Sequence, residues 1–387
     1  GRYPPTFASR GCYNRQARRK MRNHLPRSRR TLGFSLIGLM IAITIGLILL
    51  TGLSYIFLGA NEQSKELQKT AQQIENGRFS IDTLTQNIHH AGFYGHFSSP
   101  VTVPGSLSDP CEISSLTTLQ DALAFPIQGY RAADWSSIPD VTGTTCDDKG
   151  LLVAANMKAG SDVLVIRRAA TQSLPIGAVP QANDVYILST SGRLTVQVGT
   201  TTAITATSQT DGATSCSPYC MQNNKTAPIR KYVTHVYFVA PCSIGSGANG
   251  ICASSDDAIP TLKRLELVSE SGTRKMKIVP LVEGVEYLKV EYGLDSSPAT
   301  ASVTGFPGDG IVDSFTAAPA SVADWANVIS AKIYVLARNT VSTPGYADTK
   351  TYAMGSVTTS AANDAFKRHV YSAHVRLINP MGRREIP

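Results

Sequence analysis

The stretch TLGFSLIGLMIAITIGLILL, residues 31–50, decides the fold because it opens a long run without charge. No residue in 34–60 is charged, and about 20 apolar residues suffice for a helix to cross a bilayer. A cleaved secretory signal has a shorter apolar core, and small residues follow that core at the cut site. Here the small residue, Gly33, comes before the apolar run. The pattern therefore predicts a membrane-spanning helix over residues 34–60.

The charges on the two sides of this helix indicate its orientation. Residues 1–33 contain no acidic residue and ten basic ones, namely Arg2, Arg10, Arg15, Arg18, Arg19, Lys20, Arg22, Arg27, Arg29 and Arg30. Positive charge stays in the cytoplasm, so we expect the C-terminal bulk of the chain to cross the inner membrane. The other 26 basic residues are balanced by 28 acidic ones. Direct binding to nucleic acid is therefore not expected.

The helical pattern continues beyond the membrane segment. Apolar residues recur at spacings of three, four and seven, with polar residues between them, at Leu67, Ala71, Ile74, Ile81, Leu84 and Ile88. This spacing predicts an amphipathic helix with one apolar stripe. Gly92 is its predicted end, and Gly77 is a possible soft point within it. Taken as one element, residues 34–90 form a helix roughly 85 Å long.

Six cysteines lie beyond the apolar segment, and Cys12 lies before it. An even number in loop-rich surroundings favours disulfides and an oxidising compartment. The simplest connectivity joins neighbours, which gives Cys111–Cys146, Cys216–Cys220 and Cys242–Cys252. A four-cysteine zinc site is the alternative, but the paired C-x-x-C knuckles of such sites are missing.

The rest of the chain alternates short β-rich runs with Gly, Pro, Ser and Asn clusters. Nine runs are predicted strands: residues 162–169, 184–190, 193–198, 231–240, 262–269, 276–281, 285–293, 329–338 and 369–378. Their alternation suits an antiparallel sheet with one solvent-exposed face, and residues 96–160 are expected to be irregular. The predicted fold class is α+β, with a long N-terminal helix whose second half packs on a β-rich head.

The leader and several later segments carry a family resemblance. A basic leader ending in Gly33 and followed by FSLIGLMIAITIGLILL is similar to the N-terminal signal of type IV prepilins. In that family a membrane peptidase cuts after the glycine and methylates the new N-terminus, here Phe34. The resemblance makes Met21 the expected start. Residues 72–95, 281–295, 325–339 and 369–379 resemble the PilW family of minor pilins, whereas residues 96–230 match nothing recognisable.

The resemblance implies a domain organisation and a function. The expected parts are the leader (1–33), a membrane-spanning half-helix (34–60), an amphipathic half-helix (61–92) and a periplasmic, pilin-like head (93–387). The implied function is that of a minor pilin that primes a type IV pilus or sits at its tip, in adhesion, twitching motility or DNA uptake. Implied partners are other minor pilins, the major pilin, a PilY-type tip adhesin and prepilin peptidase. Neither a cofactor nor enzymatic activity is expected.

Position 38 departs from the family pattern. Most prepilins carry a glutamate there, which pairs with the terminal amine of a neighbouring pilin, and Gly38 cannot form that pair. Gly38, Ala42 and Gly46 recur every four residues, a spacing that lets helices approach closely in membranes. Glycine is also common in membrane helices without such a role. Recruitment by helix packing and a position at the filament tip are the two interpretations.

Other motifs give weaker signals for chemistry. Residues 245–250 match G-x-G-x-x-G but lie between two cysteines and precede no helical pattern, so we expect a loop closed by a disulfide. Asp309 and Asp313 are weak calcium candidates, because the neighbouring positions lack the remaining oxygen ligands of a calcium loop. A structural role is expected for the histidines at His89, His90, His96, His369 and His374.

Two other functions remain open. A minor pseudopilin of a type II secretion system shares the leader and the fold, although the head here is long for that role. A membrane-tethered periplasmic enzyme or binding protein is the alternative from another class. No nucleophile elbow or pair of carboxylates at catalytic spacing supports it.

Overall fold

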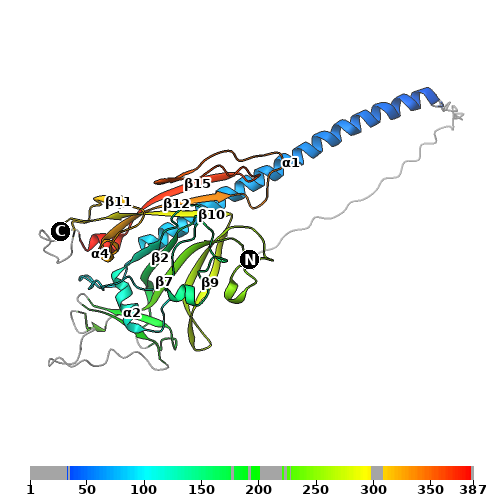
Figure 1. Ribbon diagram of the computed structural model, residues 1–387. Helices are drawn as coiled ribbons and strands as arrows, with labels where there is room; N and C mark the ends of the chain where they lie inside the picture. The colour runs from blue at the N-terminus through cyan, green and yellow to red at the C-terminus, as the bar shows by residue number, and fades with distance from the viewer. Residues whose placement is uncertain are drawn as a thin grey trace, which may run out of the picture. The chain divides into compact units, whose positions relative to one another are not determined.

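A helix of 54 residues, α1 (Leu36–His89), and two antiparallel sheets make up the fold (Figure 1). The computed structural model describes residues 33, 35–175, 178–190, 193–200, 220–221, 225–226, 228–297 and 308–384. They form two compact units, which divide between Glu62 and Gln63. The predicted α+β class, with a long N-terminal helix and a β-rich head, is confirmed.

The first half of α1 presents apolar side chains in every direction. Large residues on all sides of the helix are well exposed, for example Leu36 at 76%, Ile48 at 71% and Leu53 at 64%. The hydroxyl group of Thr51 donates a hydrogen bond back to the carbonyl of Leu47, so this polar group is satisfied within the helix. By length and composition α1 can cross a membrane.

The larger sheet, which we call sheet A, has seven strands. Along its main path β1 pairs with β2, β2 with β7, β7 with β3 and β3 with β4, while β8 and β9 extend the sheet from β7. The strands are β1 (Ile127–Tyr130), β2 (Val163–Ser173), β3 (Val185–Ser189), β4 (Leu194–Val198), β7 (Ile229–Ala240), β8 (Thr261–Glu270) and β9 (Thr273–Glu283).

The smaller sheet, sheet C, lies beside the second half of α1 in Figure 1. Its order is β11-β10-β12-β15, from β10 (Val285–Leu294), β11 (Ser314–Thr316), β12 (Val328–Arg338) and β15 (Arg368–Arg376). Two short ribbons, β5 (Cys220–Met221) with β6 (Lys225–Thr226) and β13 (Ala353–Met354) with β14 (Val357–Thr358), complete the described strands. All nine predicted strands are present, but the last ends at Arg376, before α5 (Ile378–Gly382) begins.

Sheet A corrects one prediction. We expected one solvent-exposed face, yet β3 is buried along its whole length and β2 is buried in its first half. Residues 96–160 are largely irregular, as expected, but they cover one face of the sheet. They contain α2 (Leu116–Asp121), the 3-10 turn η1 (Ala122–Ala124) and α3 (Thr145–Asp148), and they contribute core residues such as Leu119, Leu123 and Leu152.

The other face of sheet A packs against α1 and sheet C. That second core contains Leu84 and Ile88 of α1 together with Leu164 of β2 and Ile333 of β12. Sheet A is therefore the middle layer of the head. Because both of its faces are covered, the first four residues of β2 (VLVI) and the first four of β3 (VYIL) are apolar without alternation.

Two of the three predicted disulfides are present in the described residues. Cys111 is bonded to Cys146, and Cys242 is bonded to Cys252. The first ties the 96–160 layer to itself, and the second closes the glycine-rich loop, as expected. The side chains of Cys216 and Cys220 lie outside the described part of the chain, as does Cys12, so their pairing stays a prediction.

Candidate functional site

The second half of α1 packs against the two sheets of the head. We call this contact the docking seam. The buried residues of α1 are Gln73, Gly77, Ser80, Leu84 and Ile88. Their spacing of three and four residues places them on one helix face. Leu84 and Ile88 are completely buried, and each such side chain contributes about 1.5–3 kcal/mol relative to an exposed one.

The docking seam differs from the predicted apolar stripe. Leu84, Ile88 and the half-buried Ile81 do face the core, but Leu67 and Ile74 are 71% and 41% exposed. Near its N-terminal end the docking face carries a glycine and polar residues, because the strands approach the helix too closely there for large apolar side chains. The predicted spacing of three and four residues is confirmed, but in this part of the helix the prediction assigned the wrong face to the contact with the head.

At Gly77 the backbone of α1 and a side chain of the head come very close together. A β-carbon at this position would lie only 2.1 Å from Cε2 of Tyr371, on β15. The ring of Tyr371 therefore lies directly against the backbone of α1, where only glycine leaves room. What the sequence indicated as a soft point in the helix is a steric requirement of docking.

Amide side chains of α1 fix the register of the helix on the head. The buried Gln73 donates through Nε2 to the carbonyls of Ala337 (2.9 Å) and Lys367 (3.1 Å), at adjacent ends of β12 and β15. Asn76 donates to the carbonyl of Glu283, where β9 ends. The carbonyl of Lys367, just before β15, also accepts from the backbone N–H of Asn339, so Gln73 binds where the two strands are already joined.

Charged groups surround the N-terminal end of the docking seam. Glu66 is 2.7 Å from Lys69 Nζ and 3.0 Å from Lys367 Nζ, and it accepts a hydrogen bond of 2.9 Å from the hydroxyl of Thr343. The hydrogen bonds from Lys69, Lys367 and Thr343, in that order, lower the pKa of Glu66 from 4.5 to about 2. Ionised Glu66 thus ties α1 to two segments of the head.

The pKa of Glu66 predicts a pH dependence of stability. Because the folded-state pKa lies below the unfolded value of 4.5, the stabilisation is fully present above pH 4.5 and is lost as pH falls toward about 2. We expect Glu66→Gln to lower the unfolding temperature above pH 4.5 and to converge with the unsubstituted protein near pH 2. Thermal unfolding of both proteins over this pH range measures the difference in unfolding temperature. Glu75→Gln, on an exposed part of the same helix, is the control, and an equal effect from it would contradict the prediction.

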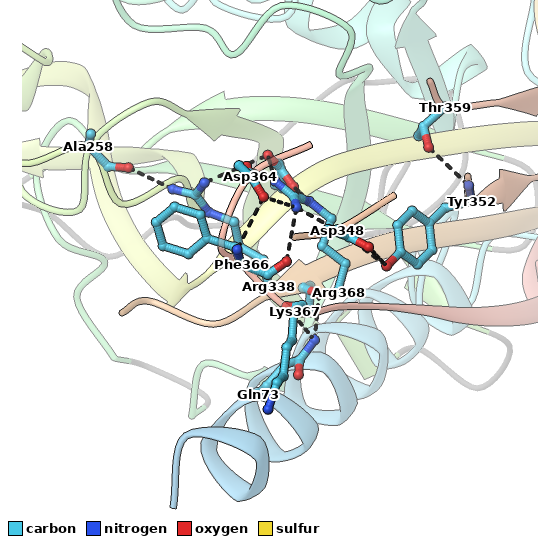
Figure 2. A network of polar contacts seen from close by, with 12 residues as sticks. Gln73, Ala258, Arg338, Asp348, Tyr352, Thr359, Asp364, Phe366, Lys367 and Arg368 are labelled. Atoms are coloured by element: carbon cyan, nitrogen blue, oxygen red, sulfur yellow. Dashed lines mark hydrogen bonds and ion pairs between the residues drawn. The ribbon is translucent and has the colours of Figure 1, made fainter. Parts of the chain in front are cut away.

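A second polar cluster holds the segment before β15 against sheet C (Figure 2). The guanidinium of Arg368, whose side chain is 3% exposed, reaches Glu286 at 2.5 Å, Asp364 at 2.6 Å and Asp348 at 3.1 Å. Tyr352 donates its hydroxyl hydrogen to the fully buried Asp348. We call these five residues the Arg368 network.

The electrostatics of the Arg368 network are those of a structural ion cluster. Burial alone would lower the pKa of Arg368, but the hydrogen bonds to Asp364 and Glu286 outweigh it and raise the pKa above its usual value. The bond from Arg368 in turn lowers the pKa of Asp364. One buried cation thus pairs with three carboxylates, an arrangement that fixes the segment before β15 on sheet C.

The start of α1 was the predicted processing site. Gly33 is exposed, and the helix begins at Leu36, with Leu39 N–H donating to the carbonyl of Ser35. Phe34 lies outside the described residues. Apart from the adjoining helix backbone, no described residue comes within 4 Å of a β-carbon built at Gly38 or Gly46, so this face of the described helix leaves room for another helix.

The remaining candidate residues occupy ordinary structural positions. Asp309 and Asp313 accept hydrogen bonds from the backbone N–H groups of Ile311 and Ser296, and these turns do not direct their carboxylates to a common point. His89 Nδ1 lies 3.2 Å from the carbonyl of Arg376. Within the described part of the chain, no three His, Cys, Asp or Glu residues are grouped so as to hold a metal ion.

Two family models match this chain. The model of the type IV pilus-assembly protein W, PilW, matches residues 236–379, from within β7 to the start of α5. The model of the prokaryotic N-terminal methylation motif matches residues 28–54, which include the first part of α1. The chain is a PilW-like, prepilin-type protein. No curated protein and no solved structure gives a significant match.

The match places this PilW-like protein among type IV pilus-related proteins and corresponds to one part of the fold. Residues 236–379 include all of sheet C, the Arg368 network and Tyr371 of the docking seam. PilW is a pilus-assembly family rather than a known family of enzymes. Sequence reasoning missed Gln73, Tyr371 and the Arg368 network, and only the glycine at position 77 gave a local signal for any of them.

Proposed function

We propose that this protein is a minor pilin that primes the assembly of a type IV pilus or occupies its tip. The observation that carries the proposal is that a single helix, α1, starts in the methylation motif and ends in the docking seam of a PilW-like head. The exposed apolar half is suited first to the membrane and then to packing among other pilin helices. The head is then the surface for partners, which by family resemblance are other minor pilins, the major pilin and a PilY-type tip adhesin.

We further propose that the precursor sits in the inner membrane with its head in the periplasm and is later part of the pilus. The two disulfides support an oxidising compartment for the head. By family resemblance, prepilin peptidase cuts between Gly33 and Phe34 and methylates Phe34. The corresponding parts are the leader (1–33), the membrane half-helix (34–60), the amphipathic half-helix (61–92) and the head (93–387).

Processing is tested by the mass of the protein extracted from membranes. We expect a mature chain that begins with N-methylated Phe34, because the cleavage signal precedes an exposed helix start. A chain that keeps residues 21–33 would contradict the prepilin assignment. A strain lacking prepilin peptidase is the control and should accumulate the precursor.

The pilus role is tested by deleting the gene. We expect the loss of surface pili, restored by the gene supplied in trans. Normal pili with a defect in protein secretion would favour the pseudopilin alternative. Normal pili without a secretion defect would favour a tethered enzyme or binding protein.

Position 38 separates the two interpretations of the missing glutamate. If Gly38 with Ala42 and Gly46 forms a close helix contact, Gly38→Glu should block incorporation, because a buried unpaired carboxylate costs about 2.5–3.5 kcal/mol at the bilayer centre. If the subunit sits at the tip, the same change should be tolerated or should allow incorporation further along the filament. Immunogold labelling of this protein along sheared pili measures where it is incorporated. Gly59→Ala, on the same helix with open space around it, is the control.

A further inference from the structure

A cavity of about 310 Å³ opens in the head where α4 (Val322–Ala326), α5, η1 and the loop at residues 100–103 meet. Its walls are mostly apolar and include Pro100, Val103, Leu123, Pro126, Ala323 and Pro380. Two arginines, Arg383 and Arg384, also belong to the lining. We call it the Arg383 pocket. Its volume is at the lower end of the range found for ligand sites.

Arg384 is a structural part of this pocket. Its side chain is 95% buried and lies 3.4 Å from the carboxylate of Asp295. It also donates to the carbonyl of Ala326 (2.8 Å) and to Oδ1 of Asn327 (3.1 Å), at the C-terminal end of α4. Arg384 thus has a carboxylate partner and ties α4 to the wall of the pocket.

Arg383 is held differently. Its Nε donates to the carbonyl of Asn379 at 3.0 Å, its Nη2 donates to the carbonyl of Gly92, and its guanidinium lies over the ring of Tyr94. No carboxylate within the described ranges pairs with it. Burial, and to a smaller extent the nearby Arg384, lowers its pKa. Of the two lining arginines, Arg384 is paired with the buried Asp295, whereas Arg383 has no carboxylate partner among the described residues and is positioned by three other groups.

We propose that the Arg383 pocket binds a segment of a partner protein in which an Asp or Glu side chain stands next to a large apolar side chain. The carboxylate pairs with Arg383, and the apolar side chain fills the space between the prolines and alanines. A guanidinium held in a fixed orientation binds a carboxylate well, because its N–H groups match the two oxygen atoms.

A protein segment fits the surroundings of the pocket better than a free small molecule does. Apolar side chains at and near the rim are exposed: Val103 of the wall is 44% exposed, and Ile378, two positions before Pro380 of the wall, is 57% exposed. An extended segment covers these side chains as well as the pocket, whereas a small carboxylic acid leaves them in water. The pocket also adjoins Gly92, just beyond the C-terminal end of α1, since a β-carbon there would lie 3.0 Å from Pro380 and 3.1 Å from Pro126 of the lining.

The test uses the full chain in detergent micelles and two acetylated tripeptide amides, Leu-Glu-Leu and Leu-Gln-Leu. The chain has two tryptophans, and Trp325 lies on α4 between the pocket residues Ala323 and Ala326. In a Trp135→Phe background its fluorescence reports occupation. We expect saturable binding of the glutamate peptide and about tenfold weaker binding of the glutamine peptide, because a charge-assisted hydrogen bond is lost.

Substitutions connect the binding to the pocket. Arg383→Gln should remove the preference for glutamate, Arg383→Lys should keep part of it, and Arg193→Gln, on an exposed arginine elsewhere, should leave it unchanged. Arg383 also holds Gly92, so Arg383→Gln could perturb folding. Ala323→Phe is the second variant, because Ala323 is exposed at the pocket, and a large side chain there should block both peptides.

Several results would overturn the inference. They are equal affinity for the two peptides, an unchanged preference in Arg383→Gln, or no saturation at about 10 mM peptide. Binding that appears only after removal of residues 385–387 would show that the chain's own end fills the pocket. Only the identity of the partner as a pilus component rests on the proposed function. Peptide binding in a protein whose deletion leaves pili normal would contradict that function and not the pocket.

Discussion

Replacing Arg368 with leucine is expected to destabilise the head by about 3–5 kcal/mol, because it removes the cation from a buried ion cluster. Among the described residues, Asp348 would keep only tyrosine hydroxyls as side-chain donors, and Glu286 would keep only Arg338, at 3.8 Å. Both carboxylates are more than 90% buried. The loss should therefore exceed that of any exposed ion pair, for which about 0–1 kcal/mol is typical.

Thermal or urea unfolding of the full chain in micelles measures this effect. Arg368→Lys should recover part of the stability, since an ammonium group keeps the charge but cannot form the paired bonds to Asp364 and Glu286. Arg376→Gln is the matched control, because Arg376 is exposed at the other end of the same strand. A loss below about 1 kcal/mol in Arg368→Leu would show that the network contributes little.

Gly77→Val should detach the second half of α1 from the head or shift the helix along it. The β-carbon alone would lie 2.1 Å from Cε2 and 2.5 Å from Cζ of Tyr371, so either the ring or the helix must move. Overpacking of this kind costs about 1–3 kcal/mol, and more where the backbone must shift. Alanine in place of glycine in a helix interior would otherwise stabilise the chain by about 1 kcal/mol.

A double-mutant cycle separates the two effects at this position. In Gly77→Ala the steric cost should dominate, whereas in Gly77→Ala with Tyr371→Ala the helix preference should show. Hydrogen exchange in residues 70–90 would report the detachment, because those amides lose their cover. Gly59→Ala is the control for a helical glycine with open space around it. Additive effects of Gly77→Ala and Tyr371→Ala would mean that the contact does not hold the helix.

Much of the fold was predictable because its signals are local. A run without charge behind basic residues identifies a membrane helix from neighbouring positions alone. The predicted strands are stretches of β-branched and aromatic residues between turn residues, and β2, β7 and β12 appear where expected. Each of the two disulfides of the described residues joins two cysteines that follow one another along the chain. The order of the cysteines therefore sufficed to predict these two pairs.

The packing faces were not predictable in this way. Strands β2 and β3 were expected to have a solvent-exposed face. Whether a face is exposed depends on how residues 96–160 pack on it, and no local pattern in the strands reveals that packing. Leu67 and Ile74 have the right spacing for the docking seam and yet are exposed. The same spacing describes several helix faces, and only the shape of the opposing sheets selects among them.

The sequence alone predicted a long apolar helix of the prepilin type followed by a β-rich head, and both are present. Hydropathy, charge and strand pattern are properties of adjacent residues, so they can be recognised in the sequence without knowledge of the fold. Only the tertiary structure decided how α1 is held, where the Arg368 network lies and which of the two arginines of the Arg383 pocket is paired with a carboxylate. Gln73 and Lys367 meet although 294 positions separate them in the chain, and such a contact depends on the path of every strand between them.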